Sequence, residues 1–238
     1  MNIAIIGYGR MGHEIESAAL GRGHAVKLIV DKDNMDDLNE RSTRDVDVAI
    51  EFTTPGTAFE NVVKCLKMKI PVVSGTTGWL SDYDKAVDAC NENRTSFLHS
   101  TNFSIGVNIL FRLNRELAKQ MARLDQYKPF IEEIHHTRKL DAPSGTAITL
   151  AQGIAAVHKD YDSWCPDDRT EPGKVPVKAI REGMVPGTHT IAWTSDIDVI
   201  SLRHEARNRK GLALGAVIAA EYIYNRTGVF TMDQVLGF

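Results

Sequence analysis

The sequence predicts an α/β protein with two domains, a parallel-sheet domain and a smaller α+β domain with an open sheet. Three observations predict this fold class. Short apolar runs alternate with helical patterns in the first half of the chain, and predicted strands gather in the second half. The length of 238 residues is also sufficient for one to two domains.

The first half of the chain predicts five buried strands separated by helices. Apolar runs that end at glycine, polar or acidic residues place the strands at residues 2–6, 25–30, 46–50, 71–73 and 96–99. Apolar residues at helical spacing place helices at residues 11–20, 57–68 and 81–90. Ser81 is the expected N-cap of the third helix. Strands that alternate with helices imply a parallel sheet covered on both faces.

The pattern changes after Asn102, where strands no longer alternate strictly with helices. Helices are predicted at residues 105–121, 144–157 and 212–224. Strands are predicted at residues 130–136, 175–180, 189–193 and 198–203. The polar segment 161–174 contains prolines and a glycine, and we expect it to be a loop. This order of elements predicts the smaller α+β domain.

Composition excludes several classes of protein. The chain is 43% hydrophobic and 25% charged, which is typical of a globular protein. Its net charge of −3 argues against a nucleic-acid-binding protein, which usually has a basic excess. The longest apolar stretch, residues 211–220, is too short to cross a membrane. Cys65, Cys90 and Cys165 form no disulfide or metal-binding motif, so we expect a cytoplasmic protein with reduced thiols.

A glycine motif directly follows the first predicted strand. Its pattern is GxGxxG, and its residues are Gly7, Tyr8, Gly9, Arg10, Met11 and Gly12. The glycines permit a tight turn and close approach of a pyrophosphate, and the start of the next helix supplies N–H groups. Asp31 ends the second strand about 20 residues later, where an acidic residue binds ribose hydroxyls. The motif predicts a dinucleotide site; the alternative is a glycine turn that binds no nucleotide.

The expected cofactor is NADH or NADPH. Asp31 favours NADH because a carboxylate repels a 2′-phosphate, whereas Lys32 can pair with that phosphate. Two further strand ends should reach the same crevice, because ligands bind at the carboxyl ends of parallel strands. These strand ends supply Gly75, Thr76, Thr77, Thr101, Asn102 and Phe103. Either of them is alternatively an ordinary turn between a strand and a helix.

The densest group of chemically active residues follows the strand predicted at 130–136. His135 and His136 are adjacent on an extended strand and therefore point to opposite faces, so we expect no metal site there. Lys139 is a cation that can bind a carboxylate. The helix start at Ser144, Gly145 and Thr146 is an anion site. Together they predict a pocket for a small anion; the alternative is a solvated basic loop.

These motifs together resemble the dihydrodipicolinate reductase family, whose members act in bacterial lysine and diaminopimelate synthesis. The resemblance rests on GRMG at 9–12, EFT at 51–53, GTTG at 75–78, NFSIGVN at 102–108, and HH at 135–136 followed by Lys139 and DAPSGT at 141–146. These blocks stand in family order and span about two thirds of the chain. The block from the two histidines to Ser-Gly-Thr is highly specific.

The resemblance implies an NAD(P)H-dependent oxidoreductase that reduces 4-hydroxy-tetrahydrodipicolinate, a small dicarboxylate. It implies a Rossmann domain at 1–104 with 210–238, and a mixed-sheet domain at 105–209 that binds substrate and forms a homotetramer. His135 and Lys139 would be catalytic, and the substrate would be bound by His136, Lys139, Ser144, Gly145 and Thr146. Residues 7–12, Asp31, Lys32, 75–77 and 101–103 would bind the cofactor.

Two other functions stay open at this point. One is another NAD(P)-dependent dehydrogenase of a small amino or keto dicarboxylate, which need not carry the block from His135 to Thr146. The other is a nucleotide-sensing module without turnover. Substitution of Lys139 would leave such a module unchanged.

Overall fold

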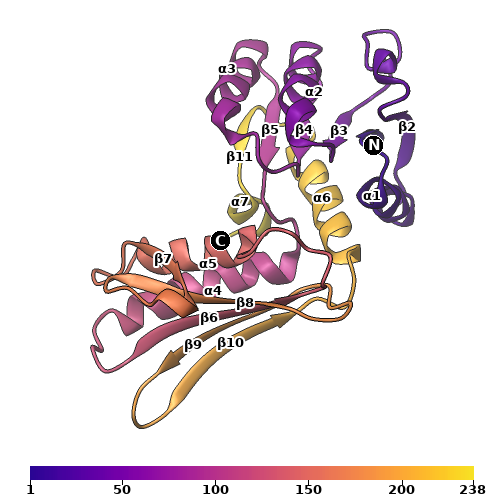
Figure 1. The fold of residues 1–238 in the computed structure, drawn as a ribbon. Helices are drawn as coiled ribbons and strands as arrows, with labels where there is room; N and C mark the ends of the chain where they lie inside the picture. Colours follow the sequence, from indigo (N-terminus) through magenta and orange to yellow (C-terminus); the bar gives the residue numbers. More distant parts are fainter. The chain divides into compact units, whose positions relative to one another are not determined.

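The computed structural model describes residues 1–238, which form two compact units. The first unit contains Met1–Ile105 and Arg209–Phe238, and the second contains Gly106–Asn208. In Figure 1 the end of the chain, in yellow, lies among the elements of the indigo and purple first unit. None of the helices combines the length and the apolar character that crossing a membrane requires.

The first unit is built on a six-stranded sheet in which every neighbouring pair is parallel. The strand order is β11-β5-β4-β3-β1-β2. The strands are β1 (Asn2–Ile6), β2 (Ala25–Val30), β3 (Val48–Glu51), β4 (Val72–Ser74), β5 (Ser96–His99) and β11 (Gly228–Phe230). The chain runs from β1 outward to β2 and then returns to β3 on the other side of β1. The carboxyl ends of strands at such a reversal are the usual ligand site of an open α/β sheet.

Helices cover both faces of this sheet, as the sequence predicts. One face packs against α1 (Arg10–Gly21), α6 (Lys210–Ile223) and α7 (Met232–Leu236), and the other against α2 (Pro55–Lys67) and α3 (Tyr83–Asn93). Successive side chains of a strand point to opposite faces, so Ile3 and Ile5 enter one core while Ala4 and Ile6 enter the other. This two-sided burial explains why the strands are continuous apolar runs.

The second unit is a five-stranded mixed sheet with helices on one face. Its order is β10-β9-β6-β8-β7, where β6 is parallel to β8 and β8 to β7, and the other pairs are antiparallel. Helices α4 (Ile105–Met121) and α5 (Gly145–Ala155) share one core with the sheet residues Ile131, Val177, Ile191 and Trp193. The strands are β6 (Lys128–His135), β7 (Ser163–Pro166), β8 (Lys174–Arg181), β9 (Thr188–Thr194) and β10 (Val199–Glu205).

The structure corrects three of the expectations about local structure. The expected loop at 161–174 contains β7 and a 3₁₀ turn at Asp167–Arg169, because this short segment extends the sheet beside β8. Ser81 is not a helix N-cap, since it lies in a 3₁₀ turn and α3 begins at Tyr83. The short elements β11 and α7 were not predicted, although Thr231 and Gln234 form a capping box that marks the start of α7.

Candidate active site

The glycine loop joins β1 to α1, and two of its glycines are required by the packing of the chain itself. Gly7 has a φ of +92°, and a Cβ there would lie 2.1 Å from the carbonyl oxygen of Phe52. A Cβ on Gly12 would lie 2.4 Å from the carbonyl oxygen of Gly7. Both distances are far below van der Waals contact, so the tight turn needs glycine at both positions.

Gly9 has no such internal reason to be glycine. A Cβ at this position would meet nothing within 4 Å, and Gly9 is the N-cap of α1 without a side-chain cap. It borders a hollow of about 510 Å³, which is lined by Gly9, Arg10, Met11, Phe52, Thr53, Pro55, Gly75, Thr76, Thr77 and Arg209. An open glycine, uncapped helix N–H groups and an adjacent arginine fit the pyrophosphate of a dinucleotide.

A buried carboxylate organises the opposite wall of this hollow. Glu51, at the end of β3, is fully buried and accepts hydrogen bonds from Ser74 Oγ at 2.6 Å and Thr76 Oγ1 at 2.7 Å. It also accepts from the backbone N and hydroxyl of Thr53, at 2.9 Å and 2.5 Å. Gly75 lies against the ring of Phe52, where a Cβ would come within 2.2 Å. Glu51 therefore holds the carboxyl ends of β3 and β4 in one arrangement.

The other residues expected to bind cofactor lie outside the lining of this hollow. Asp31 and Lys32 follow the end of β2, where the backbone N of Asp31 donates to Asn34 Oδ1 at 2.7 Å and the Lys32 side chain is exposed. The Tyr8 hydroxyl donates to Glu16. Phe103 is 1% exposed and belongs to the core, so only its backbone is available to a ligand. Thr101 and Asn102 precede it in the segment after β5.

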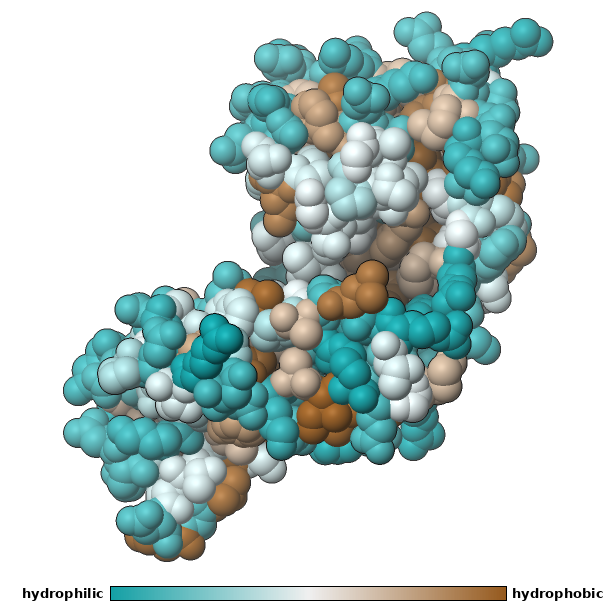
Figure 2. All heavy atoms as spheres, viewed as in Figure 1, coloured by the Kyte–Doolittle hydropathy of each residue, from teal (hydrophilic) through white to brown (hydrophobic).

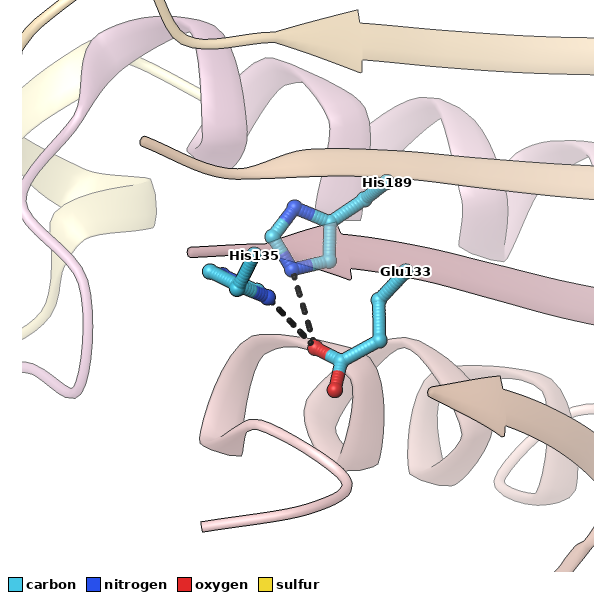
Figure 3. A group of neighbouring side chains, drawn as sticks. All are labelled: Glu133, His135 and His189. Carbon is cyan, nitrogen blue, oxygen red and sulfur yellow. Dashed lines mark ion pairs between the residues drawn. The ribbon is translucent and has the colours of Figure 1, made fainter. Parts of the chain in front are cut away.

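In the second unit, the register of the sheet assembles a cluster around Glu133. Glu133 and His135 lie two residues apart on β6 and share the helix-covered face. His189 on β9 stands opposite Glu133, and Arg181 on β8 stands opposite His135. Figure 3 shows the side chains of Glu133, His135 and His189 pointing toward one another. Three strands that are distant in sequence thus meet at one point.

The two carboxylate oxygens of Glu133 have different partners. Oε1 accepts from the backbone N of Ser144 at 2.9 Å and from Arg181 Nη2 at 3.0 Å. Oε2 lies 3.1 Å from His135 Nδ1 and 3.7 Å from His189 Nε2. Burial opposes ionisation of Glu133, but its contacts with His135, Ser144 and Arg181 outweigh that effect and lower its pKa to about 2. The pKa of His189 is lowered to about 3, first by burial and second by the electrostatic effect of His135.

The start of α5 connects this cluster to the segment after β6. Ser144 is the N-cap, and its Oγ accepts from the backbone N of Ala147 at 3.2 Å and contacts His189 Nε2 at 3.2 Å. A Cβ on Gly145 would meet nothing within 4 Å, so the first turn of α5, which includes Thr146, is open beside Gly145. Such a helix start favours a bound carboxylate.

Arg181 and Lys139 shape the segment between His135 and Ser144. Arg181 donates to the carbonyl oxygens of Lys139 and Asp141, which anchors the segment to β8. Lys139 Nζ lies 2.8 Å from Asp141 Oδ2, and 23% of the lysine side chain is exposed. The pKa of Asp141 is lowered because the effect of Lys139 exceeds that of partial burial, which raises it. His136 is half-buried immediately after β6.

The sequence prediction named residues of this segment but gave no role to three side chains that the structure places beside them. It placed His135, Lys139 and Ser144 near one another, and the structure brings them to the same end of the sheet. It assigned no role to Glu133, Arg181 or His189, although a carboxylate two residues before His135 on one strand face was a usable signal. The expectation of no metal site at His135 and His136 took no account of residues on other strands, whereas Glu133, His135 and His189 present donor atoms within 4.8 Å of one another.

Comparison with protein families finds matches to both units. The dihydrodipicolinate reductase N-terminal family model matches residues 1–103, and the C-terminal model matches residues 106–236. A 4-hydroxy-tetrahydrodipicolinate reductase from Christiangramia forsetii is 50% identical over 237 residues, which cover 99% of this chain and 98% of that protein. One from Neisseria gonorrhoeae is 32% identical and covers 93% of this chain and 84% of that protein.

A solved structure shows the same fold across both units. It is a dipicolinate-bound dihydrodipicolinate reductase from Paenisporosarcina sp. TG-14, with a TM-score of 0.76 and 23% identity, covering 97% of each chain. A probable dehydrogenase from Thermotoga maritima is less similar, with a TM-score of 0.59 and 13% identity, covering 99% of this chain and 92% of that one.

Proposed function

The chain belongs to the dihydrodipicolinate reductase family, and on this basis we propose that it reduces 4-hydroxy-tetrahydrodipicolinate to tetrahydrodipicolinate with NADH or NADPH. It is then an oxidoreductase of lysine and diaminopimelate biosynthesis. The observation that carries the proposal is the cluster at the end of β6. There His135 and Lys139 lie near the open start of α5. The other unit of the chain carries the glycine loop of a dinucleotide-binding fold.

Residues 1–104 with 210–238 form the cofactor-binding domain in this proposal. Gly7, Gly9 and Gly12 with Arg10 bind the pyrophosphate, and Asp31 and Lys32 lie at the end of β2, where the ribose binds in such folds. Tyr8 and Met11 complete the loop, and Gly75 to Thr77 with Thr101 to Phe103 supply backbone groups at the ends of β4 and β5. The bound cofactor supplies the hydride that the reduction requires.

Residues 105–209 form the substrate-binding domain. A dicarboxylate needs cationic and N–H donors. The first turn of α5 supplies N–H groups at Gly145 and Thr146, and the N-cap Ser144, whose backbone N–H binds Glu133, holds this helix start in place. Lys139 and His136 supply side-chain donors. The open space beside Gly145 allows a carboxylate to approach the helix start closely.

His135 and Lys139 provide the proton chemistry. Addition of a hydride to a conjugated ring leaves negative charge on the ring, and a neighbouring atom must then accept a proton. Histidine is the side chain whose ordinary pKa lies nearest neutrality, which suits it to donate that proton. Lys139 is the second donor, and Asp141 holds its ammonium group at 2.8 Å. The loss of water from the substrate uses the same pair of residues to exchange protons.

We further propose that the protein works as a homotetramer in the cytoplasm. Strand β10 is an edge of the second sheet, and Ile197, Val199 and Ile200 are exposed there by 87%, 59% and 40%. Figure 2 shows brown side chains at the end of the second unit, where the turn between β9 and β10 lies. An apolar edge strand of this kind favours pairing with another copy. The three free, buried cysteines agree with a reducing compartment.

The function is tested by following the oxidation of NADH, and separately of NADPH, in the presence of substrate. The substrate is generated in the cuvette from pyruvate and aspartate semialdehyde by a dihydrodipicolinate synthase. The proposal predicts oxidation that depends on both compounds, and the ratio of the two rates gives the cofactor preference. If the folded protein binds NADH but oxidises neither cofactor, it is a nucleotide-sensing module or a dehydrogenase of another substrate.

A further inference from the structure

The contact between Glu133 and His135 has the form of a carboxylate that orients a histidine. Glu133 is fully buried, and its Oε2 lies 3.1 Å from His135 Nδ1. Neither of these two atoms has a hydrogen-bond partner in the protein, and each lies within ion-pair distance of the other. Buried polar atoms are almost always satisfied, so each of these atoms is the natural partner of the other.

The remaining contacts of Glu133 leave Oε2 available for the ring. Arg181 and the backbone N of Ser144 both bind Oε1, at 3.0 Å and 2.9 Å. The guanidinium of Arg181 compensates the buried negative charge, so the carboxylate can stay ionised without a second cation. A divalent cation bound by Glu133, His135 and His189 would lie beside Arg181, which already neutralises the only carboxylate of the three. This pairing therefore argues against a metal ion there.

The opposite side of the His135 ring faces a glycine. A Cβ at Gly187 would lie 3.0 Å from His135 Nε2, and Gly187 has a φ of +155°. Glycine at position 187 therefore keeps a side chain from crowding Nε2, whereas Nδ1 lies 3.1 Å from a buried carboxylate. The two ring nitrogens have different surroundings, which is the condition for one to be held and the other to react.

We propose that Glu133 is the positioning residue of His135: it holds the proton on Nδ1 and fixes the ring so that Nε2 exchanges the proton with the substrate. This inference rests on the function proposed above. The same carboxylate also binds the backbone N of Ser144, so it sets the ring of His135 and the substrate-binding start of α5 relative to each other.

The groups that face His135 come from every element around it. They are Glu133 on the same strand, His189 on β9 and Arg181 on β8. Glu133 is the carboxylate in contact with the ring. Replacing it with a neutral amide should therefore remove the carboxylate acceptor that orients the ring and lower turnover.

The test compares Glu133→Gln with Glu132→Gln, a matched control on the same strand. Glu132 faces the other side of the sheet, 3.8 Å from Lys178, so its substitution leaves the His135 ring untouched. We expect Glu133→Gln to lower kcat by about 10²-fold, the usual size of a proton-transfer contribution. The Kd of this variant for NADPH should be unchanged. Glu133→Asp should recover part of the rate, and Glu132→Gln should match wild type.

A direct measurement on the unmodified protein keeps the inference testable if Glu133→Gln does not fold. The ¹⁵N chemical shifts of the His135 ring report which nitrogen carries the proton at neutral pH. A proton on Nδ1 supports the proposal, and a ring that carries its proton on Nε2 alone overturns it. A kcat of Glu133→Gln equal to that of wild type also overturns it. An inactive wild-type protein with Nδ1–H at His135 instead rejects the proposed reaction and leaves the positioning by Glu133 intact.

Discussion

At the scale of single residues, Lys139 is the side chain on which the proposed reaction depends most. Its ammonium group is held by Asp141 in the segment that follows β6. The lysine side chain is 23% exposed, so it is available to a bound dicarboxylate. Lys139→Ala should lower kcat by about 10²-fold, because a positioned proton donor is lost. The Kd for NADPH should not change, because the glycine loop belongs to the other unit.

Steady-state kinetics and fluorescence titration with NADPH measure these two quantities for Lys139→Ala. Lys159→Ala is the matched control, since Lys159 is exposed in the same unit beyond the end of α5. Full turnover by Lys139→Ala would show that the lysine has no part in the reaction. An equal loss in Lys159→Ala would show that the effect is not specific to the site.

His189 should make the protein less stable as the pH falls. Its pKa is about 3 in the folded protein against an ordinary value of 6.5, so only the unfolded chain takes up a proton between these values. The free energy of unfolding should therefore fall from pH 6.5 downward, by up to about 1.4 kcal/mol per pH unit for this one proton. Glu133, whose pKa is lowered from 4.5 to about 2, adds a further loss below pH 4.5.

Urea unfolding between pH 7 and pH 5 measures the contribution of His189. The variant His189→Gln should show a shallower decline than wild type across this window, because the buried imidazole is gone. His13→Gln, at an exposed position on α1, should decline as wild type does. The same slope in all three proteins would contradict the assignment of this effect to His189.

At the scale of elements, the glycine loop before α1 separates a structural role from a binding role. A Cβ on Gly12 would lie 2.4 Å from a backbone oxygen, so Gly12→Ala should destabilise the protein by about 1–3 kcal/mol. A Cβ on Gly9 meets nothing in the protein but borders the hollow. Gly9→Ala should therefore keep most of the stability and weaken NADPH binding.

Urea unfolding and NADPH titration of the two variants make each the control of the other. The prediction is a large loss of stability in Gly12→Ala and a large loss of affinity in Gly9→Ala. Wild-type affinity in Gly9→Ala would mean that the pyrophosphate does not approach this glycine. Wild-type stability in Gly12→Ala would mean that the turn can relax around a methyl group.

The elements that sequence reasoning predicts well are those with a long or two-sided apolar pattern. Strand β1 and helix α4 have the predicted bounds, because buried strands and long amphipathic helices carry a strong local signal. Strands β7 and β11 have four and three residues and no such signal, and they form because a sheet edge was free beside them. The association of Glu133, His189 and Arg181 depends on strand register, which local patterns do not specify.

At the scale of the whole molecule, the chain completes its first unit only at its end. Helix α6 supplies much of one core, and a Cβ on Gly215 would lie 1.7 Å from the carbonyl oxygen of Phe103. In the sequence, Phe103 precedes the second unit and Gly215 follows it, so this close approach joins residues that are far apart along the chain. The second unit is therefore an insertion between two parts of the first.

Assembly is also a property at this scale, and β10 should determine it. Val199→Asp places a charge on an apolar edge strand and should reduce the tetramer to smaller species, because the charge would be buried between copies. Sedimentation velocity measures the species present. Leu20→Asp is the control, since Leu20 is similarly exposed, at 56%, but lies on α1 of the other unit. A monomeric wild-type protein, or equal effects of both variants, would contradict the proposed interface.

The reaction itself is tested most directly by following the transferred hydrogen into the product. The protein is given NADPH or NADH deuterated at the reactive carbon of the nicotinamide, with substrate supplied by the synthase, and the product is identified by mass spectrometry. The proposed reaction yields tetrahydrodipicolinate that carries one deuterium from the cofactor, formed with wild type and nearly absent with Lys139→Ala. Unlabelled product, or no tetrahydrodipicolinate from a folded protein that binds the cofactor, would contradict it.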